Sequence, residues 1–178
     1  MSKEHGTPVD RVSLVEVGPR DGLQNEPRLL SLAQRLLLIN RLAESGLQRI
    51  EVGAFVSPKR VPQMADSAAL FKALPRKGAT RYGALVPNLQ GLQAAIAARV
   101  DEIGLFTACS DGFTRANIGI GVEESLVRFA PLVQEARHLG IVVGLRDERR
   151  HLRRVDVAAR HVFGFVLRIE PKRVRWIL

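Results

Sequence analysis

The segment VSLVEVGPRDGLQNEP, residues Val12–Pro27, contains the pattern on which the fold is built. Its first six residues are rich in valine and leucine, which is typical of a short buried strand. A Gly-Pro dipeptide then ends the strand, and Arg20 and Asp21 follow it side by side. We therefore predict a strand that delivers two unlike charges into a turn, and the succession of strand and polar turn recurs along the chain.

Helix-like segments separate the strand-like ones. Ser31 and Gln34 are spaced as a capping box, and Gly46 is a natural helix stop. Asn88 is a candidate cap for a later helix, and Pro131 predicts a kink in the last one, because proline inside a helix loses a hydrogen bond. The predicted strands cover residues 12–17, 48–55, 80–86, 101–106 and 141–145, and the predicted helices cover residues 31–46, 61–74, 87–99 and 122–140.

This alternation makes four strand–helix units and the start of a fifth, which predicts an α/β fold with a parallel sheet. A doubly wound sheet and a partial (β/α)8 TIM barrel both satisfy the pattern. With 178 residues the chain is shorter than the about 250 that a complete barrel typically needs. The doubly wound alternative lacks its usual G-x-G-x-x-G fingerprint after the first strand.

The bulk composition argues against several classes of protein. The hydrophobic content of 46% disfavours disorder, and no apolar run reaches the roughly 18 residues of a membrane span. The first residues lack the apolar core of a secretory signal. Cys109 is the single cysteine, so an internal disulfide is impossible and a cytoplasmic location is expected. We interpret Cys109 as a small residue after the fourth strand, and His138 as a favourable partner for a helix C-terminus.

The formal charge of +9 is concentrated at the C-terminus. Residues 145–178 hold ten Lys+Arg against four Asp+Glu, a net charge of +6, whereas residues 1–144 hold 17 against 14. A basic tail is able to bind phosphates or nucleic acid, but this one contains no known nucleic-acid module. We therefore expect neither nucleic acid nor a membrane as a partner, and a basic binding protein is the weakest of the hypotheses.

Polar side chains follow the predicted strands at their carboxyl ends. Because these ends of parallel strands share one edge, the side chains are expected to meet at one rim. A carboxylate there could bind a divalent ion, and a guanidinium beside it could neutralise an oxyanion. From spacing alone, a surface ion pair between Arg20 and Asp21 is slightly favoured over such a site. The rim residues are Arg20, Asp21, Gln24, Glu51, Asn88, Ser110, Asp111 and Asn117.

Four longer stretches change that balance. They are VEVGPRDGLQNE (15–26), IEVGAFVSPKRVPQMAD (50–66), LVPNLQGLQAAIAA (85–98) and FTRANIGIGVEESLVRF (113–129). Over about residues 10–144 the chain resembles the 3-hydroxy-3-methylglutaryl-CoA lyase family, which belongs to a metal-dependent lyase and acyltransferase superfamily built on a TIM barrel. Leu23 and the following Asn25-Glu26 point to the lyase branch, because the condensing synthases usually have an acidic residue in place of Leu23.

The resemblance implies a retro-Claisen cleavage of an acyl-CoA substrate that gives acetyl-CoA and acetoacetate, as in leucine degradation and ketone-body formation. It implies Asp21 as a ligand of Mg²⁺ or Mn²⁺, and Arg20 as the catalytic group that binds substrate and stabilises the thioester enolate. It implies Glu51 as a catalytic residue that holds Arg20, and Gln24 as a substrate-binding residue. The structural alternatives are a Glu51 that only balances a buried charge and a Gln24 that only caps the turn.

The resemblance ends near Gly144. The family continues into units that carry two histidine ligands, an amide ligand and a cysteine loop, and His151 and His161 do not match them. We therefore expect residues 1–144 to be the N-terminal half of a TIM-barrel lyase domain and residues 145–178 to be a basic tail unlike the family, which we interpret as frameshifted. The alternatives to a lyase are an inactive truncated fragment and a related acyl-CoA lyase or synthase.

A half-barrel is expected to leave strand edges unpaired, at strand one and at strand four or five. Such edges, and apolar faces that the other half would cover, favour association or aggregation. Full-length members of the family are expected to be homo-oligomers.

Overall fold

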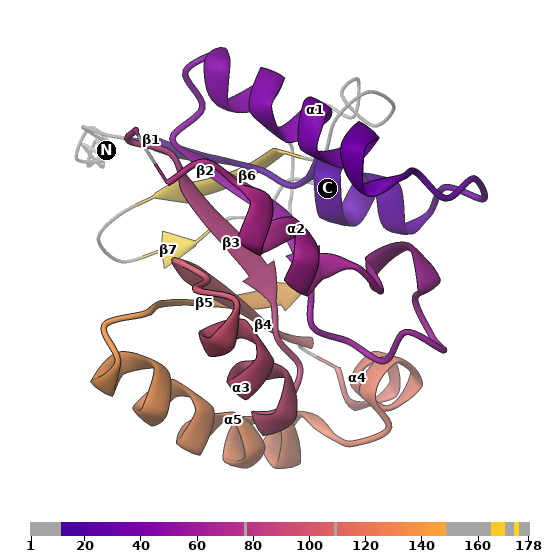
Figure 1. The fold of residues 1–178 in the computed structure, drawn as a ribbon. Helices are drawn as coiled ribbons and strands as arrows, with labels where there is room; N and C mark the ends of the chain where they lie inside the picture. Colours follow the sequence, from indigo (N-terminus) through magenta and orange to yellow (C-terminus); the bar gives the residue numbers. More distant parts are fainter. Residues whose placement is uncertain (1–11, 77, 109, 149–164, 170–172, 175–178) are drawn as a thin grey trace, which may run out of the picture.

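A curved, mostly parallel sheet is the centre of the computed structural model, which describes residues 12–76, 78–108, 110–148, 165–169 and 173–174 (Figure 1). The strand order is β5-β4-β3-β2-β1-β6-β7, and every neighbouring pair among the first five strands is parallel. These five strands are β1 (Val12–Glu16), β2 (Arg49–Ala54), β3 (Arg81–Leu85), β4 (Glu102–Ala108) and β5 (Val142–Glu148).

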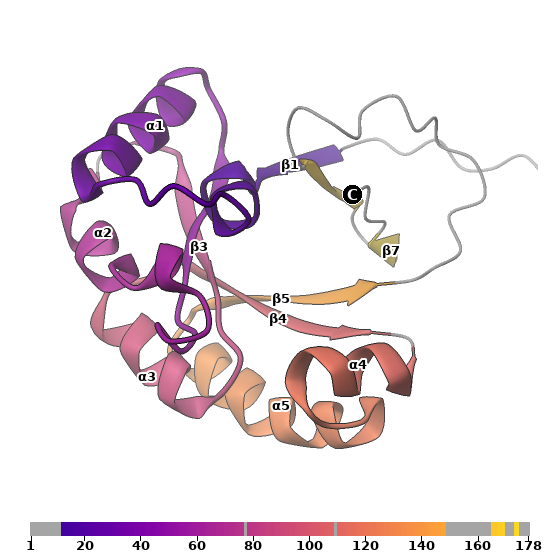
Figure 2. The same cartoon turned by 90° about the vertical axis from the view of Figure 1, so that its right-hand side faces the viewer.

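The larger helices line one side of this sheet. Figure 2 shows α1, α2, α3 and α5 along the outer side of the curve, whereas a doubly wound fold has helices on both faces. The expected α/β fold is therefore confirmed, with the curl of a partial TIM barrel. The helices are α1 (Leu32–Glu44), α2 (Ser67–Ala73), α3 (Leu89–Ala97), α4 (Asp111–Ile118) and α5 (Val122–His138).

The local rules explain where several helices begin. The Ser31 hydroxyl accepts a bond from the Gln34 amide, and the Gln34 side chain accepts one from the Ser31 amide, so the predicted capping box is present. Asn88 caps α3 by accepting from the Gly91 amide at 2.8 Å. The last helix runs as one element through Pro131.

One predicted helix, over residues 61–74, was wrong as a single element. The structure has a short 3₁₀ turn, η2 (Pro62–Met64), followed by α2 from Ser67. The reason is that two carbonyls are occupied by side chains: Gln63 O accepts from Arg35, and Met64 O accepts from the Ser67 hydroxyl. The chain therefore turns before the regular ladder of α2 begins.

Two further elements lie in segments for which no helix was predicted. A π-helical turn, η1 (Gly18–Gly22), follows β1 directly. The α4 helix follows β4, with Ser110 as its cap and Gly119 at a φ of 77° as its left-handed stop. Each lies just past the carboxyl end of a strand.

The core lies between the sheet and the outer helices. Alternate strand residues face it, because successive side chains of a strand point to opposite faces. Each fully buried large apolar side chain contributes about 1.5–3 kcal/mol. The strand residues in this core include Ile50, Val52, Tyr82, Ala84, Ile103 and Leu105, and the helices add Ile39, Leu70, Phe71, Leu92 and Leu132.

The edge at β1 differs from the expectation. The strand β6 (Phe165–Ile169) pairs antiparallel with β1 along its whole length, and β7 (Arg173–Val174) pairs with β6. The predicted unpaired edge at strand one was therefore wrong, because a segment of the basic tail occupies it. At the other end, β5 pairs only with β4 within the described part of the chain. No helix in that part is long and apolar enough to cross a membrane.

Candidate active site

The turn after β1 places two charged residues in different surroundings. The Val17 carbonyl accepts bonds from the Arg20 amide at 3.0 Å and the Asp21 amide at 2.7 Å, which winds residues 18–22 into η1. This winding buries Arg20, of which 6% is exposed, and leaves the Asp21 side chain 34% exposed. Single π turns of this kind are frequent at functional sites.

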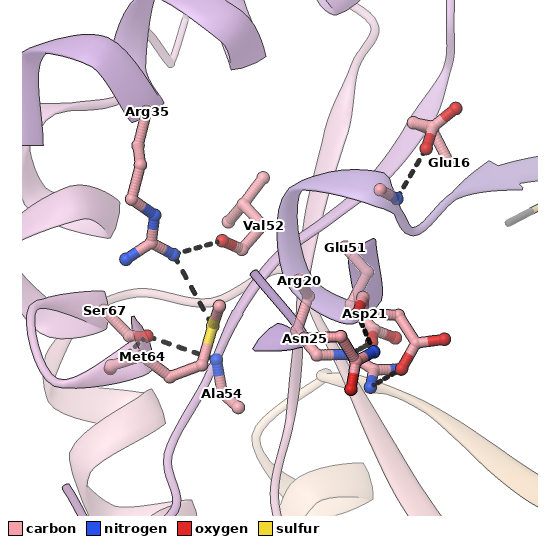
Figure 3. A network of polar contacts seen from close by, with 11 residues as sticks. Glu16, Arg20, Asp21, Asn25, Arg35, Glu51, Val52, Ala54, Met64 and Ser67 are labelled. Atoms are coloured by element: carbon pink, nitrogen blue, oxygen red, sulfur yellow. Dashed lines mark hydrogen bonds and ion pairs between the residues drawn. The ribbon is translucent and has the colours of Figure 1, made fainter. Parts of the chain in front are cut away.

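Arg20 is held by two carboxylates (Figure 3). Its Nε donates to Oε1 of Glu51, which lies on β2, and its Nη1 donates to Oδ1 of Asp21 at 2.6 Å. Glu51 is 4% exposed, so this pair is shielded from water. Burial lowers the pKa of Arg20 and the negative charge of Asp21 opposes that shift, so the guanidinium stays cationic at neutral pH.

The geometry leaves part of this guanidinium available. None of the contacts in the described part of the chain uses Nη2 of Arg20. A donor that is already fixed and desolvated stabilises a developing anion without having to reorganise. The cluster can therefore bind an oxyanion through Arg20 while Glu51 and Asp21 hold the side chain in place.

Asp21 is the group in this cluster that can reach a cation. Its Oδ1 is shared with Arg20, and no contact among the described residues uses its Oδ2. A carboxylate oxygen suits hard cations such as Mg²⁺. The described residues contain no group of three or more His, Cys, Asp or Glu that could hold a metal. They therefore supply one fitting ligand and do not complete a metal site.

Glu16 is a buried carboxylate that the sequence patterns did not single out. It is 2% exposed, and its Oε1 accepts a bond from the Gly18 amide at 2.5 Å. Burial raises the pKa of Glu16, and the bonds from the Gly18 and Val17 amides oppose that shift. Glu16 therefore ties the end of β1 to the start of η1. An acidic residue between two valines of a buried strand is the pattern that could have revealed it.

Arg35 is the second residue that those patterns missed. It is 2% exposed, although a charged residue on a helix usually faces solvent. Its position four residues before the buried Ile39 places both on one face of the helix, which could have indicated burial. Its partners lie on β2 and on the loop beyond it.

The remaining rim residues have structural contacts or lie outside the described side chains. Gln24 is half-buried directly after η1, and no described hydrogen bond involves its amide. Asn88 and Ser110 cap helices, and Asp111 accepts from the Val122 amide at 2.8 Å at the start of α5. Cys109 and the side chain of Asn117 lie outside the described part. Of the predicted rim residues, Arg20, Asp21 and Glu51 are therefore the ones that the structure brings into contact, whereas their chemical roles stay predictions.

A cavity of about 630 Å³ lies at the opposite end of the strands. Its lining includes Arg81, Asp101 and Val142, which stand at the amino ends of β3, β4 and β5. Chemistry in parallel α/β folds collects at the carboxyl ends, where Arg20 lies. We therefore place the candidate site at the Arg20 cluster and not in this cavity.

Comparison with known proteins shows which family the chain resembles. The HMGL-like family model matches residues 11–173. The chain is 47% identical over 127 residues to the 3-hydroxy-3-isohexenylglutaryl-CoA/hydroxymethylglutaryl-CoA lyase of Pseudomonas aeruginosa, covering 71% of this chain and 42% of that one. It is 49% identical over 132 residues to the hydroxymethylglutaryl-CoA lyase of Pseudomonas mevalonii, covering 74% and 44%.

Solved structures show the same fold. The hydroxymethylglutaryl-CoA lyase of Pseudomonas aeruginosa superposes with a TM-score of 0.74 at 44% identity, covering 77% of this chain and 46% of that one. An HMG-CoA lyase of Acinetobacter baumannii, in complex with coenzyme A and 3-methylmalate, superposes with a TM-score of 0.71 at 33% identity, covering 75% and 43%. The chain thus spans less than half the length of these relatives. Because the family model matches most of the chain, the chain belongs to the HMGL-like family, a family of metal-dependent carbon–carbon lyases.

Proposed function

We propose that this chain forms the enolate-stabilising part of an active site that cleaves 3-hydroxy-3-methylglutaryl-CoA to acetyl-CoA and acetoacetate. One observation carries the proposal: the buried guanidinium of Arg20 is held by Glu51 and Asp21 at the carboxyl end of β1. The identity of 47–49% to lyases named for this substrate supports it, as does the coenzyme A bound by a solved neighbour.

The reaction breaks the bond between the carbon with the tertiary hydroxyl and the carbon next to the thioester. The hydroxyl loses its proton and becomes the ketone of acetoacetate, while the bonding electrons move onto the thioester as an enolate. A proton then converts the enolate to acetyl-CoA. Arg20 would direct its Nη2–H at the enolate oxygen. The negative charge on this oxygen is present mainly in and after the transition state. Glu51 would keep the guanidinium in that orientation, and Gln24 would contribute to substrate binding.

We further propose that Asp21 is one ligand of the divalent metal, Mg²⁺ or Mn²⁺. When bound, such an ion would supply Lewis-acid chemistry toward the oxygens of the substrate. The partly exposed side chain of Asp21 and the net negative charge of the cluster of Arg20, Asp21 and Glu51 support this role. Line broadening by Mn²⁺ in an NMR spectrum would report binding directly. It should appear at the η1 amides and disappear in Asp21→Asn.

The test of function is acetoacetate release by the purified chain with Mg²⁺ and the CoA ester. Arg20→Lys keeps the charge but loses the planar fork that reaches two carboxylates, so turnover should fall by about 10²–10³. Arg76→Lys, at the amino end of the sheet, is the matched control and should retain turnover. If the unaltered chain releases no acetoacetate and does not bind the ester, the proposal fails and the chain is an inactive fragment.

A second candidate substrate follows from one relative. The Pseudomonas aeruginosa lyase that matches at 47% identity is named for 3-hydroxy-3-isohexenylglutaryl-CoA as well. The same bond is cleaved in both substrates, and only the chain on the hydroxyl-bearing carbon differs. Comparison of kcat/KM for the two esters decides between them. A tenfold ratio of the two kcat/KM values corresponds to a difference of about 1.4 kcal/mol in transition-state binding.

The division of the chain at Gly144 also stays a proposal. We propose that residues 1–144 are the lyase half-domain and that residues 145–178 are a basic tail of different, frameshifted origin, although the match to the HMGL-like family model runs to residue 173. The gene sequence tests it. A second reading frame beyond codon 144 that encodes further strand–helix units would support the proposal, and its absence would end it.

A further inference from the structure

The strand that carries Glu51 has an irregularity next to it. In the pairing of β2 with β3, Glu51 lies opposite Gly83 and Gly53 lies opposite Ala84, so Val52 is an extra residue. Such a β-bulge bends the strand, changes the direction of the side chains beside it and leaves the extra residue outside the regular ladder. The bulge therefore takes part in setting the direction of the Glu51 carboxylate.

Arg35 binds the bulge from α1 (Figure 3). Its Nη2 donates to the Val52 carbonyl at 3.0 Å, and its Nη1 donates to the Gln63 carbonyl at 3.0 Å and to the Asp66 carboxylate. One guanidinium thus joins α1, the bulge in β2 and the loop that follows β2. Its planar fork makes several directed bonds at once, which a lysine ammonium cannot reproduce.

Ser67 binds the other side of the bulge. Its hydroxyl accepts from the Ala54 amide at 3.2 Å and donates to the Met64 carbonyl at 2.7 Å. Gly53 makes room for it, since a Cβ on Gly53 would lie 2.6 Å from the Ser67 oxygen. The backbone from Val52 to Ala54 is therefore held by polar groups from two helices.

A buried arginine is a costly way to stabilise this core. Burial lowers the pKa of Arg35, and its Nε is buried without an acceptor among the described residues. An apolar side chain of similar volume is often as stable as a buried ion pair. What the guanidinium adds is direction: it fixes the Val52 carbonyl, one peptide away from Glu51.

We infer that Arg35 is a positioning residue, which holds the bulge at Val52 and thereby directs Glu51 and, through Glu51, the guanidinium of Arg20. The catalytic consequence rests on the proposed function, but the positioning itself is a property of the folded chain and is measurable without substrate.

The first measurement uses the Nε–H of Arg20 in a ¹H–¹⁵N spectrum of the full chain. This proton is buried and donates to Glu51, so its signal should exchange slowly with water, and Arg20→Lys identifies it by removing it. In Arg35→Lys the signal should shift and exchange at least about tenfold faster, because the bulge loses its directed bonds. Arg76→Lys is the control: Arg76 also binds two carbonyls and an aspartate, but at the other end of the sheet. It should leave the Arg20 signal unchanged. An unchanged signal in folded Arg35→Lys would overturn the inference.

A second variant keeps the test decisive if Arg35→Lys does not fold. Ser67→Ala removes the hydroxyl on the other side of the bulge without placing a new charge in the core, and it should also shift the Arg20 signal. If it does not, the inference fails.

An activity assay separates this inference from the proposed function. In a chain with turnover, Arg35→Lys should lower kcat by about tenfold with little change in KM, since a misdirected Arg20 weakens transition-state stabilisation. A change in the Arg20 signal, in a chain whose unaltered form neither turns over nor binds the ester, would keep the positioning role and refute the proposed function. Unchanged kcat in the variant would refute its catalytic consequence.

Discussion

The buried pair of Arg20 and Glu51 makes the sharpest prediction, and the perturbation is Glu51→Gln. The amide of glutamine keeps the shape and still offers an oxygen to the Nε–H of Arg20. The donor stays charged, so the variant loses the charge of the acceptor and not the whole bond, and the loss should be smaller than the about 1.5–3 kcal/mol that a hydrogen bond to a charged group contributes. The free energy of unfolding should therefore fall by about 1–2 kcal/mol.

Removal of the other partner should cost more. Arg20→Met removes the cation that the Glu51 carboxylate binds at 4% exposure, and breaking a buried pair in this way costs about 3–5 kcal/mol. In the double variant the carboxylate is absent as well, so the loss should be smaller than the sum of the single losses. We expect a coupling energy of at least about 1 kcal/mol.

The assay is urea unfolding of the four proteins in this double-mutant cycle, with the slope m checked for constancy. Glu102→Gln supplies the control cycle with Arg20→Met. Glu102 is also a largely buried carboxylate on the same sheet, but its partner is Arg49, at 2.7 Å. Glu102 lies on β4, two strands and about 10 Å from the strand β2 that carries Glu51. That cycle should be additive to within about 0.5 kcal/mol. Additivity in the Glu51 cycle as well would refute the idea that Glu51 holds Arg20.

Three further predictions concern single contacts. Glu16→Gln should reduce the pH dependence of stability: burial raises the pKa of Glu16, so the native state holds its proton longer than the unfolded state and stability falls as the pH rises above about 4.5. Unfolding at pH 4 and pH 7 should show a smaller difference in the variant, and an equal difference would contradict this. Gly91→Ala should destabilise the protein by about 1–3 kcal/mol through overpacking, because the added Cβ would lie 2.7 Å from the Phe55 carbonyl oxygen. This loss should outweigh the about 1 kcal/mol that alanine gains in helix propensity. A raised urea midpoint would contradict this prediction. Asp111→Ala should speed hydrogen exchange at the Val122 amide, whose acceptor it removes, and unchanged exchange would show that this bond does not hold the start of α5.

The elements were predictable where their patterns are local. The capping box at Ser31 and the cap at Asn88 depend on residues three apart, and both formed as expected. The five parallel strands follow from short apolar runs separated by turns. The segment 61–74 was not predictable in this way, since the side chain that occupies the Gln63 carbonyl comes from Arg35 on another helix. The pairing of β6 with β1 was missed for the same reason, because it joins segments about 150 residues apart.

The candidate site also has features that were predictable from the sequence and features that were not. Arg20 and Asp21 are adjacent in the sequence, and the succession of strands brings Glu51 to the same edge. Burial is a different matter, because it depends on everything that packs around a group. Glu16 and Arg35 are charged residues that were not predicted to be internal, and both are 2% exposed.

By itself, the sequence determined the α/β order, the family and the residues available at the rim, because periodicity, capping and motifs are properties of neighbours along the chain. Only the tertiary structure decided which charges are desolvated and which way they point. The winding of η1 turns Arg20 inward and leaves Asp21 half-exposed, and a bulge held by Arg35 and Ser67 lies next to Glu51. The physical reason is that the direction of a side chain and its exposure to water are set by contacts between segments far apart in the sequence.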